Sequence, residues 1–447
     1  MMEQMADHSG DADRNWRRFV LFRVLFNSRF YYPVLAVLFL DLGLSATEYT
    51  LLNFAWALAI VFTDVPAGVL ADKMGRKPLV VGATFCMVGE MLLLAFAPRN
   101  GGLWLFLMCL ANRLLSGVAE GMASGADEAL VFDSLAERNR SSEWPQVLAQ
   151  VMKWQSVGMV IAMLAGGAIY DPVFMNRVTG ALGFSFHWEQ GMTLRLPIYL
   201  NLVTALMTLV VAMGLREPAV RKAHAAPVAE GEKETATGAW ELVLAAGSWI
   251  KGTPVALFVI VGGLALDSVI RLFLTFSSSY FRLISLPEAV FGLIGATFGG
   301  LGLIISPVAK WMVGCNTLLR NYALIAAVTF GSLIGVAFQW RLWGVMFMLP
   351  MAMAMMALGF LVSYYLNALV DSSQRATVLS FKGLAFNLGY GFISLVFAVV
   401  LRAFRDGGDA EAALSRGLRF LPVWLGLTLA LLAVAFWRRR GLLQKKY

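Results

Sequence analysis

Charged side chains interrupt several long apolar stretches of this 447-residue sequence, and they are the first candidates for binding chemistry. In the first stretch, Arg29 is followed by Tyr31 and Tyr32. A guanidinium group can bind an anionic group of a ligand, and tyrosines add hydroxyl donors and a stacking surface. The alternative is structural, because Arg29 can equally pair with a neighbouring carboxylate and hold two helices together.

Arg113 and two carboxylates form a second group of candidates. Glu120 follows Arg113 in the same apolar stretch, and Glu90 lies near the middle of the preceding stretch. Arginine does not release its proton in proteins, but it changes the proton affinity of a nearby carboxylate when helices rearrange. Glu90 and Glu120 are therefore the candidates for a carboxylate that binds and releases a proton. A static buried ion pair is the alternative.

A third group lies in the second half of the sequence. Asp267 and Arg271 are four residues apart, so they share one face of a helix. They form either a self-neutralised pair, which we favour, or a site at which a protonatable Asp267 changes partner. Lys382 and Asn387, in a later apolar stretch, are expected to face the same space. All three histidines lie outside the apolar stretches, so a carboxylate is expected to carry any coupled proton.

The elements that must position these side chains are membrane-spanning helices. Charged residues make up only 14% of the sequence and apolar residues 59%, with a mean hydropathy of +0.70. A soluble protein has about 25% charged residues. Runs of about 20 apolar residues can cross a bilayer as helices, so the sequence predicts an all-α polytopic membrane protein. We expect twelve spans, at residues 19–42, 46–70, 78–97, 103–125, 146–170, 193–214, 254–281, 287–312, 321–340, 343–369, 376–402 and 416–438.

The distribution of basic residues predicts the orientation of the chain. Lysine and arginine concentrate in alternate loops and in the C-terminal tail, which places both termini in the cytoplasm. A hydrophilic stretch near the middle separates two sets of six spans and suggests an internal duplication. The expected order is a tail at 1–18, a six-helix bundle at 19–214, a linker with an amphipathic helix at 215–253, a second bundle at 254–438 and a basic tail at 439–447.

Several classes of function are not supported by the sequence. The net charge of +8 is spread over short loops, so it does not indicate nucleic-acid binding. No nucleotide-binding loop, hydrolase motif or clustered metal-ligand spacing is present in the sequence. We expect neither an enzyme nor a bound cofactor or metal. If the protein performs work, we expect the energy for that work to come from an ion gradient.

A short charged hinge connects the second and third spans. It runs from Gly68 to Pro78 with the sequence Gly-Val-Leu-Ala-Asp-Lys-Met-Gly-Arg-Lys-Pro. So few residues force the two helices to lie antiparallel and adjacent. Glycines at 68 and 75 allow close backbone approach and positive φ angles, and Pro78 suits the first turn of the next helix.

This hinge resembles the signature loop of the major facilitator superfamily, whose pattern is G-x-L-A-D-R-x-G-R-K. Lys73 stands where arginine is usual. A second segment, Leu110 to Gly117, resembles the superfamily pattern L-x-x-R-x-x-Q-G, with Ser116 in the glutamine position. The hinge positions that match are Gly68, Leu70, Ala71, Asp72, Gly75, Arg76 and Lys77.

A third segment departs from a family pattern. Antiporter members carry G-x-x-x-G-P-x-x-G-G in the fifth span. Gly158, Gly166 and Gly167 fit this pattern, but Ala162 and Met163 replace its central Gly-Pro. The departure weakens an assignment as a drug/proton antiporter.

The resemblance implies a fold and several residue roles. Such transporters consist of two six-helix halves that expose a central site alternately to each side of the membrane. The resemblance implies that Arg113 takes part in proton coupling, with Glu90 or Glu120 as the carboxylate that carries the proton. It also implies that Asp72 latches the two halves in the outward-facing state. Charged residues around the hinge are expected to close the inner face with it, and the expected latch comprises Asp64, Gly68, Asp72, Gly75, Arg76, Lys77, Asp127 and Arg138.

The sequence therefore predicts a monomeric secondary transporter of a small organic solute, coupled to protons and located in a prokaryotic inner membrane. The cavity is expected between spans 1, 4, 7, 10 and 11. Its basic residues favour an anionic or zwitterionic solute. The 22 methionines and 31 phenylalanines fit a second hypothesis, a pump for lipophilic compounds. A membrane receptor or scaffold on a transporter fold is the alternative from another class.

Overall fold

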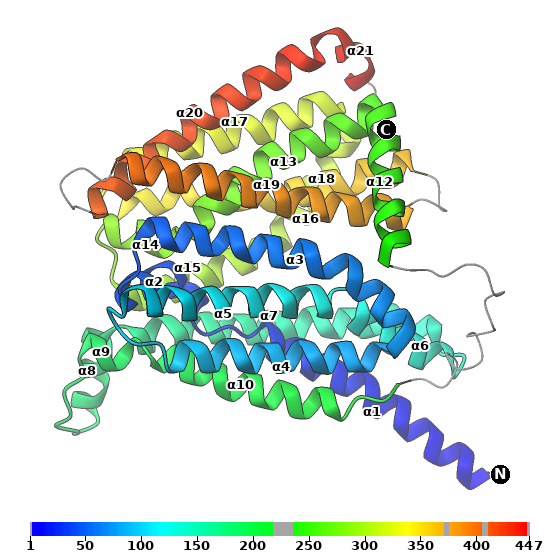
Figure 1. Cartoon of the computed structure of the whole chain (residues 1–447), viewed down its shortest axis with the longest axis horizontal. Coiled ribbons are helices and arrows are strands. Elements are labelled where there is room, and N and C mark those ends of the chain that lie inside the picture. The colour runs from blue at the N-terminus through cyan, green and yellow to red at the C-terminus, as the bar shows by residue number, and fades with distance from the viewer. Residues whose placement is uncertain (1, 218–235, 371–374, 405–409, 445–447) are drawn as a thin grey trace. The chain divides into compact units, whose positions relative to one another are not determined.

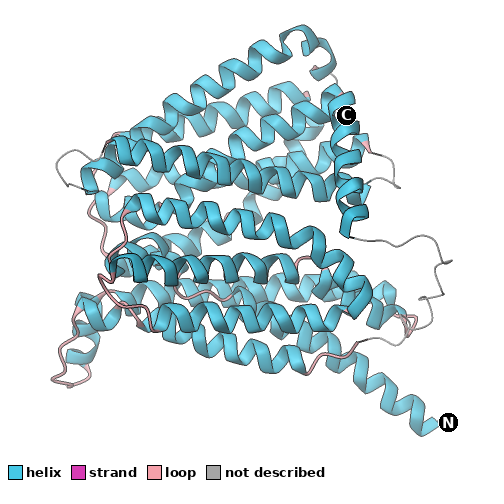
Figure 2. Cartoon of the chain, viewed as in Figure 1, coloured by secondary structure: helices cyan, strands magenta, loops and turns pink. Residues whose placement is uncertain are grey.

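The computed structural model describes residues 2–217, 236–370, 375–404 and 410–444. Throughout these residues the chain consists of helices and connecting loops, without a strand (Figure 2). Ten of the described helices are long and apolar enough to span a membrane, and a bent pair raises the number to eleven. The prediction of an all-α polytopic membrane protein is confirmed.

The first of two compact units contains residues Met1–Pro33 and Ala59–Ala239. Within it, α4 packs against α5 and α10, and α1 packs against α7 and α10 (Figure 1). Its helices are α1 (Met2–Asn27), the second part of α3 (Ala46–Met74), α4 (Arg76–Ala95), α5 (Gly102–Ala123), α6 (Ala126–Ala136), α7 (Trp144–Tyr170), α8 (Pro172–Ala181), α9 (Gln190–Thr193) and α10 (Leu196–Met213).

The second unit contains Val34–Leu58 and Trp240–Tyr447. Helix α13 forms its centre, packed against α18, α19 and α20. The helices of this unit are α2 (Leu35–Leu42), the first part of α3, most of α12 (Ala236–Gly252), α13 (Pro254–Thr275), α14 (Ser277–Leu283), α15 (Glu288–Gly300), α16 (Gly302–Cys315), α17 (Leu318–Ala337), α18 (Met348–Leu369), α19 (Arg375–Ala403), α20 (Ala410–Phe436) and α21 (Arg440–Leu443).

The division into units differs from the expected bundle boundaries in one segment. Residues 34–58, expected in the bundle at 19–214, pack with the second unit. Helix α1 begins at Met2, within the expected tail. The part of the linker from 218 to 235 and the last three residues of the basic tail lie outside the described residues.

The expected continuous span at 19–42 is wrong, because α1 ends at Asn27 and α2 begins at Leu35. Two side chains at the end of α1 form hydrogen bonds with backbone carbonyl groups of the last turn of that helix. Asn27 donates to the Arg23 carbonyl oxygen at 2.8 Å, and Ser28 donates to the Val24 carbonyl oxygen at 2.6 Å. Such local bonds compete with continued helix formation. Pro33 adds a second cause, because it has no amide hydrogen and cannot donate an α-helical hydrogen bond, and residues Tyr32–Val34 form a short 3-10 helix instead.

Two spans of the second unit are also interrupted. The span expected at 254–281 is divided at Phe276 into α13 and α14. In the span expected at 287–312, α15 and α16 meet at a bend of 41°. The bend coincides with Gly299, Gly300 and Gly302, and small residues of this kind permit a helix to bend.

The charged hinge is shorter than expected. Helix α3 continues to Met74 and α4 begins at Arg76, so the reversal takes place at Gly75 alone, which has a φ of 102°. A positive φ favours glycine, as predicted for this position. A positive φ and a close backbone approach were also predicted for Gly68, and that prediction is wrong. Gly68 lies inside α3, and no described atom lies within 4 Å of the position that a Cβ would take. Pro78 lies in the first turn of α4, as expected.

Candidate transport site

The interruption after α1 is held within the first unit by α7 and α10. The Phe30 amide donates to the Asn201 side-chain oxygen at 2.6 Å. Gly158 and Gly166 of α7 lie directly against the same segment, because a Cβ on Gly158 would lie 2.8 Å from the Ser28 Oγ and a Cβ on Gly166 would overlap the Phe30 carbonyl. The glycines thus let a non-helical segment pack against α7.

This packing buries an ion pair between Arg29 and Glu90. The Arg29 guanidinium bonds to the Glu90 Oε1, and the two side chains are only 2% and 0% exposed. Phe26 lies beneath the guanidinium with its ring centre at 5.3 Å. Among the described residues, the Glu90 Oε2 has no hydrogen-bond partner although it is buried. The Glu90 Oε2 is thus the polar atom of this buried pair that has no described hydrogen-bond donor.

The other residues predicted for this half gather around the pair. Glu120 interacts electrostatically with both Arg29 and Glu90, and Arg113 is buried on the same helix, α5. Tyr31 is buried and Tyr32 partly exposed, and their rings meet edge to face at 5.3 Å. The sequence-predicted residues of the first unit therefore form one cluster.

The second unit contains a separate polar cluster on α13 and α19. The Asp267 carboxylate pairs with Arg271 at 2.7 Å, one helical turn away. Arg271 also donates to the Asn387 side-chain oxygen at 2.9 Å and lies over the Tyr390 ring at 5.4 Å. The Tyr390 hydroxyl is 3.1 Å from that of Thr275. The structure thus shows the intrahelical pair that the sequence favours.

Lys382 lies within electrostatic range of this cluster. It interacts with both Asp267 and Arg271, but within the described chain its ammonium forms no ion pair. Its ammonium nitrogen lies 5.9 Å from the centre of the Phe386 ring. Trp56 of α3, which the sequence did not single out, meets Tyr390 edge to face at 6.3 Å. Lys382 is therefore the cation of this cluster that has no ion-pair partner among the described residues.

The turn at Gly75 is fixed by charges of the first unit. The Glu217 carboxylate accepts from the Arg76 amide at 2.9 Å and from the Lys77 amide at 2.6 Å. The Arg76 side chain pairs with Asp133 of α6 and donates to the Ala129 carbonyl oxygen at 2.6 Å. Glu217, far along the sequence, therefore caps the first turn of α4.

The remaining latch candidates do not all join that network. Asp127 is buried and pairs at 3.2 Å with Arg23 of α1, a partner that sequence reasoning missed. Asp64 interacts with the Ser124 side chain instead. Arg138 is half-buried just after α6, and the side chain of Asp72 lies outside the described part of the structure.

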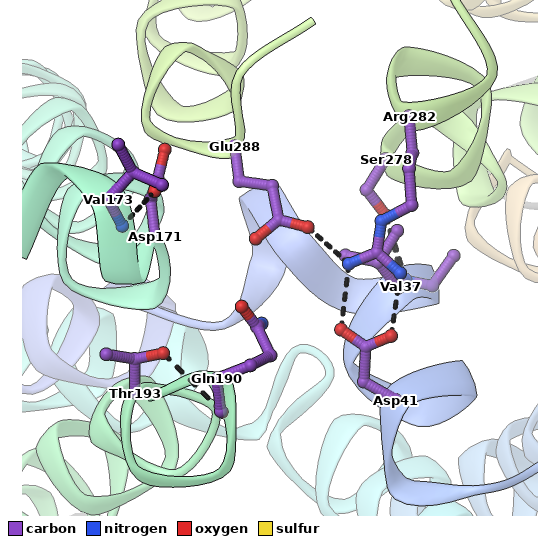
Figure 3. A network of polar contacts seen from close by, with 10 residues as sticks. Val37, Asp41, Asp171, Val173, Gln190, Thr193, Ser278, Arg282 and Glu288 are labelled. Atoms are coloured by element: carbon purple, nitrogen blue, oxygen red, sulfur yellow. Dashed lines mark hydrogen bonds and ion pairs between the residues drawn. The ribbon is translucent and has the colours of Figure 1, made fainter. Parts of the chain in front are cut away.

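A further ion-pair cluster, in the second unit, was not predicted. Arg282 of α14 binds both carboxylate oxygens of Asp41, at 2.6 and 2.8 Å, and also pairs with Glu288 (Figure 3). Ser278, one turn earlier, accepts from the Ala36 and Val37 amides at 3.0 and 3.2 Å. These contacts satisfy the first turn of α2 and tie it to α14. Among the described residues, no three histidine, cysteine or acidic side chains are grouped so that they could hold a metal ion.

The sequence model of the Major Facilitator Superfamily matches residues 19–438 of this chain. The chain belongs to this superfamily. It is therefore a multi-pass membrane transporter and not an enzyme.

Known structures agree on the fold. The nucleoside transporter NupG is 14% identical to this chain and superposes on it with a TM-score of 0.69. The superposition covers 94% of this chain and 98% of the NupG chain. A D-xylose-proton symporter, also 14% identical, covers 93% and 97% of the two chains with a TM-score of 0.61.

A relative of known function matches part of the sequence. The quinolone resistance protein NorA of Staphylococcus aureus is 28% identical over 158 residues, which cover 34% of this chain. The match spans only 36% of NorA. The activity of NorA as a whole is therefore not transferred to this chain by the match.

Proposed function

We propose that this superfamily member is a proton-coupled secondary transporter of a small organic solute that carries an anionic group. The Arg29–Glu90 pair supports proton coupling. Glu90 is buried, is held by one cation through Oε1, and has no described partner at Oε2. A buried polar atom without a partner is costly, and uptake of a proton or contact with a solute would relieve that cost.

The charge balance of the two clusters supports the solute class. In the first unit Arg29 and Arg113 are matched by Glu90 and Glu120, which gives a formal charge of zero.

In the second unit Asp267 offsets Arg271, and Lys382 is left as the additional cation. Three carboxylates thus offset three of the four basic side chains, and the two clusters together have one net positive charge. The four basic residues are Arg29, Arg113, Arg271 and Lys382. An anionic group at Lys382, with any cationic group of a zwitterion near Asp267, fits this balance.

Transport into proteoliposomes tests this proposal. Vesicles with an internal pH-sensitive dye would be mixed with amino acids, aromatic carboxylates, nucleosides or lipophilic cations, with and without an imposed pH gradient. We expect a solute with an anionic group to move protons and to accumulate. In Glu90→Gln vesicles, accumulation should fall at least tenfold while exchange of solute across the membrane continues. Unchanged proton movement in Glu90→Gln would contradict the assigned coupling role.

A pump for lipophilic compounds is the second candidate, and the partial match to NorA favours it. If lipophilic cations alone move protons in the same vesicles, this candidate replaces the first. A receptor or scaffold would move no solute and would tolerate neutral substitutions of Glu120 and Asp267.

We further propose, from the sequence patterns, that both termini are cytoplasmic and that the protein is a monomer of the inner membrane. We also propose that Asp72 acts in a conformational latch.

A further inference from the structure

One segment of the first unit lies outside the bundle of long helices (Figure 1). It comprises residues 172–189, namely α8 and the loop that follows it, and is called the crosswise hairpin below. Helix α7 ends at Tyr170 and α8 begins at Pro172, so the hairpin starts at the end of a membrane span. Figure 1 shows α8 leaving the long helices of this unit in a crosswise direction, at the end opposite α6.

The hairpin has a specified geometry. Asp171 caps α8 by accepting from the Val173 amide at 2.8 Å (Figure 3). Its other end is closed by Asn176, whose side chain donates to the Trp188 carbonyl oxygen at 2.9 Å and accepts from the Trp188 amide at 2.7 Å. Gly183, with a φ of 81°, ends the helix. Side chains on the hairpin are thus held in place.

Its exposed face is apolar. Phe174, Val178 and Leu182 follow one another at intervals of four residues, so they lie on one side of α8. Leu182 is 68% exposed and Phe184 65%. The large exposed apolar side chains are Val173, Phe174, Val178, Leu182, Phe184 and Phe186. Exposed apolar side chains concentrated in one short segment are typical of a surface that contacts a membrane or another protein.

We propose that the crosswise hairpin lies in the membrane–water interface, with this apolar face buried at the boundary between lipid headgroups and acyl chains. The flanking spans carry exposed apolar side chains that face lipid, among them Ile161 of α7 and Val203 of α10. The hairpin continues that lipid-facing surface around the end of the unit. Exposed Arg177 lies beside the apolar face, where its long side chain can reach lipid phosphates.

Spin-label accessibility in vesicles tests this location. Cys86, Cys109 and Cys315 are replaced by serine or alanine, and single labels are placed by Leu182→Cys or, as a water-exposed control, Glu189→Cys. Leu164→Cys on α7 is the lipid-facing control. We expect the label at 182 to be more accessible to oxygen than to a water-soluble nickel complex, as at 164, and the label at 189 to show the reverse.

Two results would overturn the proposal. Preferential access of the nickel complex to the label at 182 would place the face in water. Low access of both reagents, together with dipolar broadening between labels, would show a second copy of the chain on this face.

A second measurement keeps the natural cysteines. The Phe184→Trp variant adds tryptophan fluorescence to that of the unmodified protein, and the difference between the two reports on position 184. Lipids brominated near the headgroup should quench this difference severalfold more than lipids brominated near the chain end. Absence of quenching by both lipids would contradict insertion at this depth. Neither experiment depends on the solute or on proton coupling, so its outcome is independent of the proposed transport activity.

Discussion

The backbone carbonyl of Phe30 occupies the space where Gly166 would carry a side chain. Phe30 belongs to the interrupted segment after α1, and Gly166 belongs to α7. A glycine is required here because a Cβ would overlap backbone atoms, which cannot move aside as a flexible side chain can. The position of Arg29, one residue earlier, depends on this contact.

Gly166→Ala should therefore destabilise the protein by about 3 kcal/mol or more, since overpacking against backbone forces the segment to shift. Thermal unfolding of the detergent-purified protein measures the effect. Gly331→Ala in α17 is the matched control, because a Cβ there meets no described atom within 4 Å. The control should be neutral or slightly stabilising. Equal melting temperatures for both variants would show that the close contact is not present in solution.

The buried pair Arg29–Glu90 should show strong coupling in a double-mutant cycle. Arg29→Gln alone leaves a buried carboxylate without its cation and should cost about 3–5 kcal/mol. The double variant Arg29→Gln/Glu90→Gln removes both charges and should recover much of that loss in thermal unfolding. Additive losses would mean that the two groups do not interact. Recovery of stability should not restore gradient-driven transport, because the proton acceptor is absent.

The pair Arg282–Asp41 should behave differently because it is partly exposed, with side-chain exposures of 39% for Arg282 and 16% for Asp41. Exposed ion pairs contribute about 1 kcal/mol or less and are screened by salt. The coupling energy between Arg282→Gln and Asp41→Asn should therefore be small at low salt and should decrease further in 1 M salt, where the Debye length is about 3 Å. The Arg29–Glu90 coupling, measured in parallel, should change little. A salt-insensitive Arg282 coupling would contradict the exposed geometry.

Much of the fold was predictable because membrane helices have a strong sequence signal. Lipid requires about 20 apolar residues per span, and the expected span at 376–402 matches α19 to within a residue at each end. The intrahelical pair Asp267–Arg271 was also predictable, since its two residues are one turn apart on the same helix. Local spacing alone was sufficient in both cases.

The missed contacts join residues that are distant in the sequence. Phe30 and Asn201 are 171 positions apart, and Asp41 and Arg282 are 241 apart. An asparagine or a serine inside an apolar helix carries no signal of its partner, because tertiary packing decides which groups meet. The break after Asn27 had local causes in Asn27, Ser28 and Pro33, but apolar residues on both sides concealed it.

The reversal between α3 and α4 provides a final test, because it separates two glycines of one motif. Gly75→Ala should destabilise the protein by about 1–2 kcal/mol, since a φ of 102° is unfavourable for a residue with a Cβ. Gly68→Ala should be neutral or slightly stabilising, because the residue lies in α3 and the space beside it is open. Glu217→Gln should cost about 1 kcal/mol, because the carboxylate that caps α4 loses its charge. Thermal unfolding of the three variants measures these effects, and an equal loss for both glycines would show that Gly68 has a packing partner.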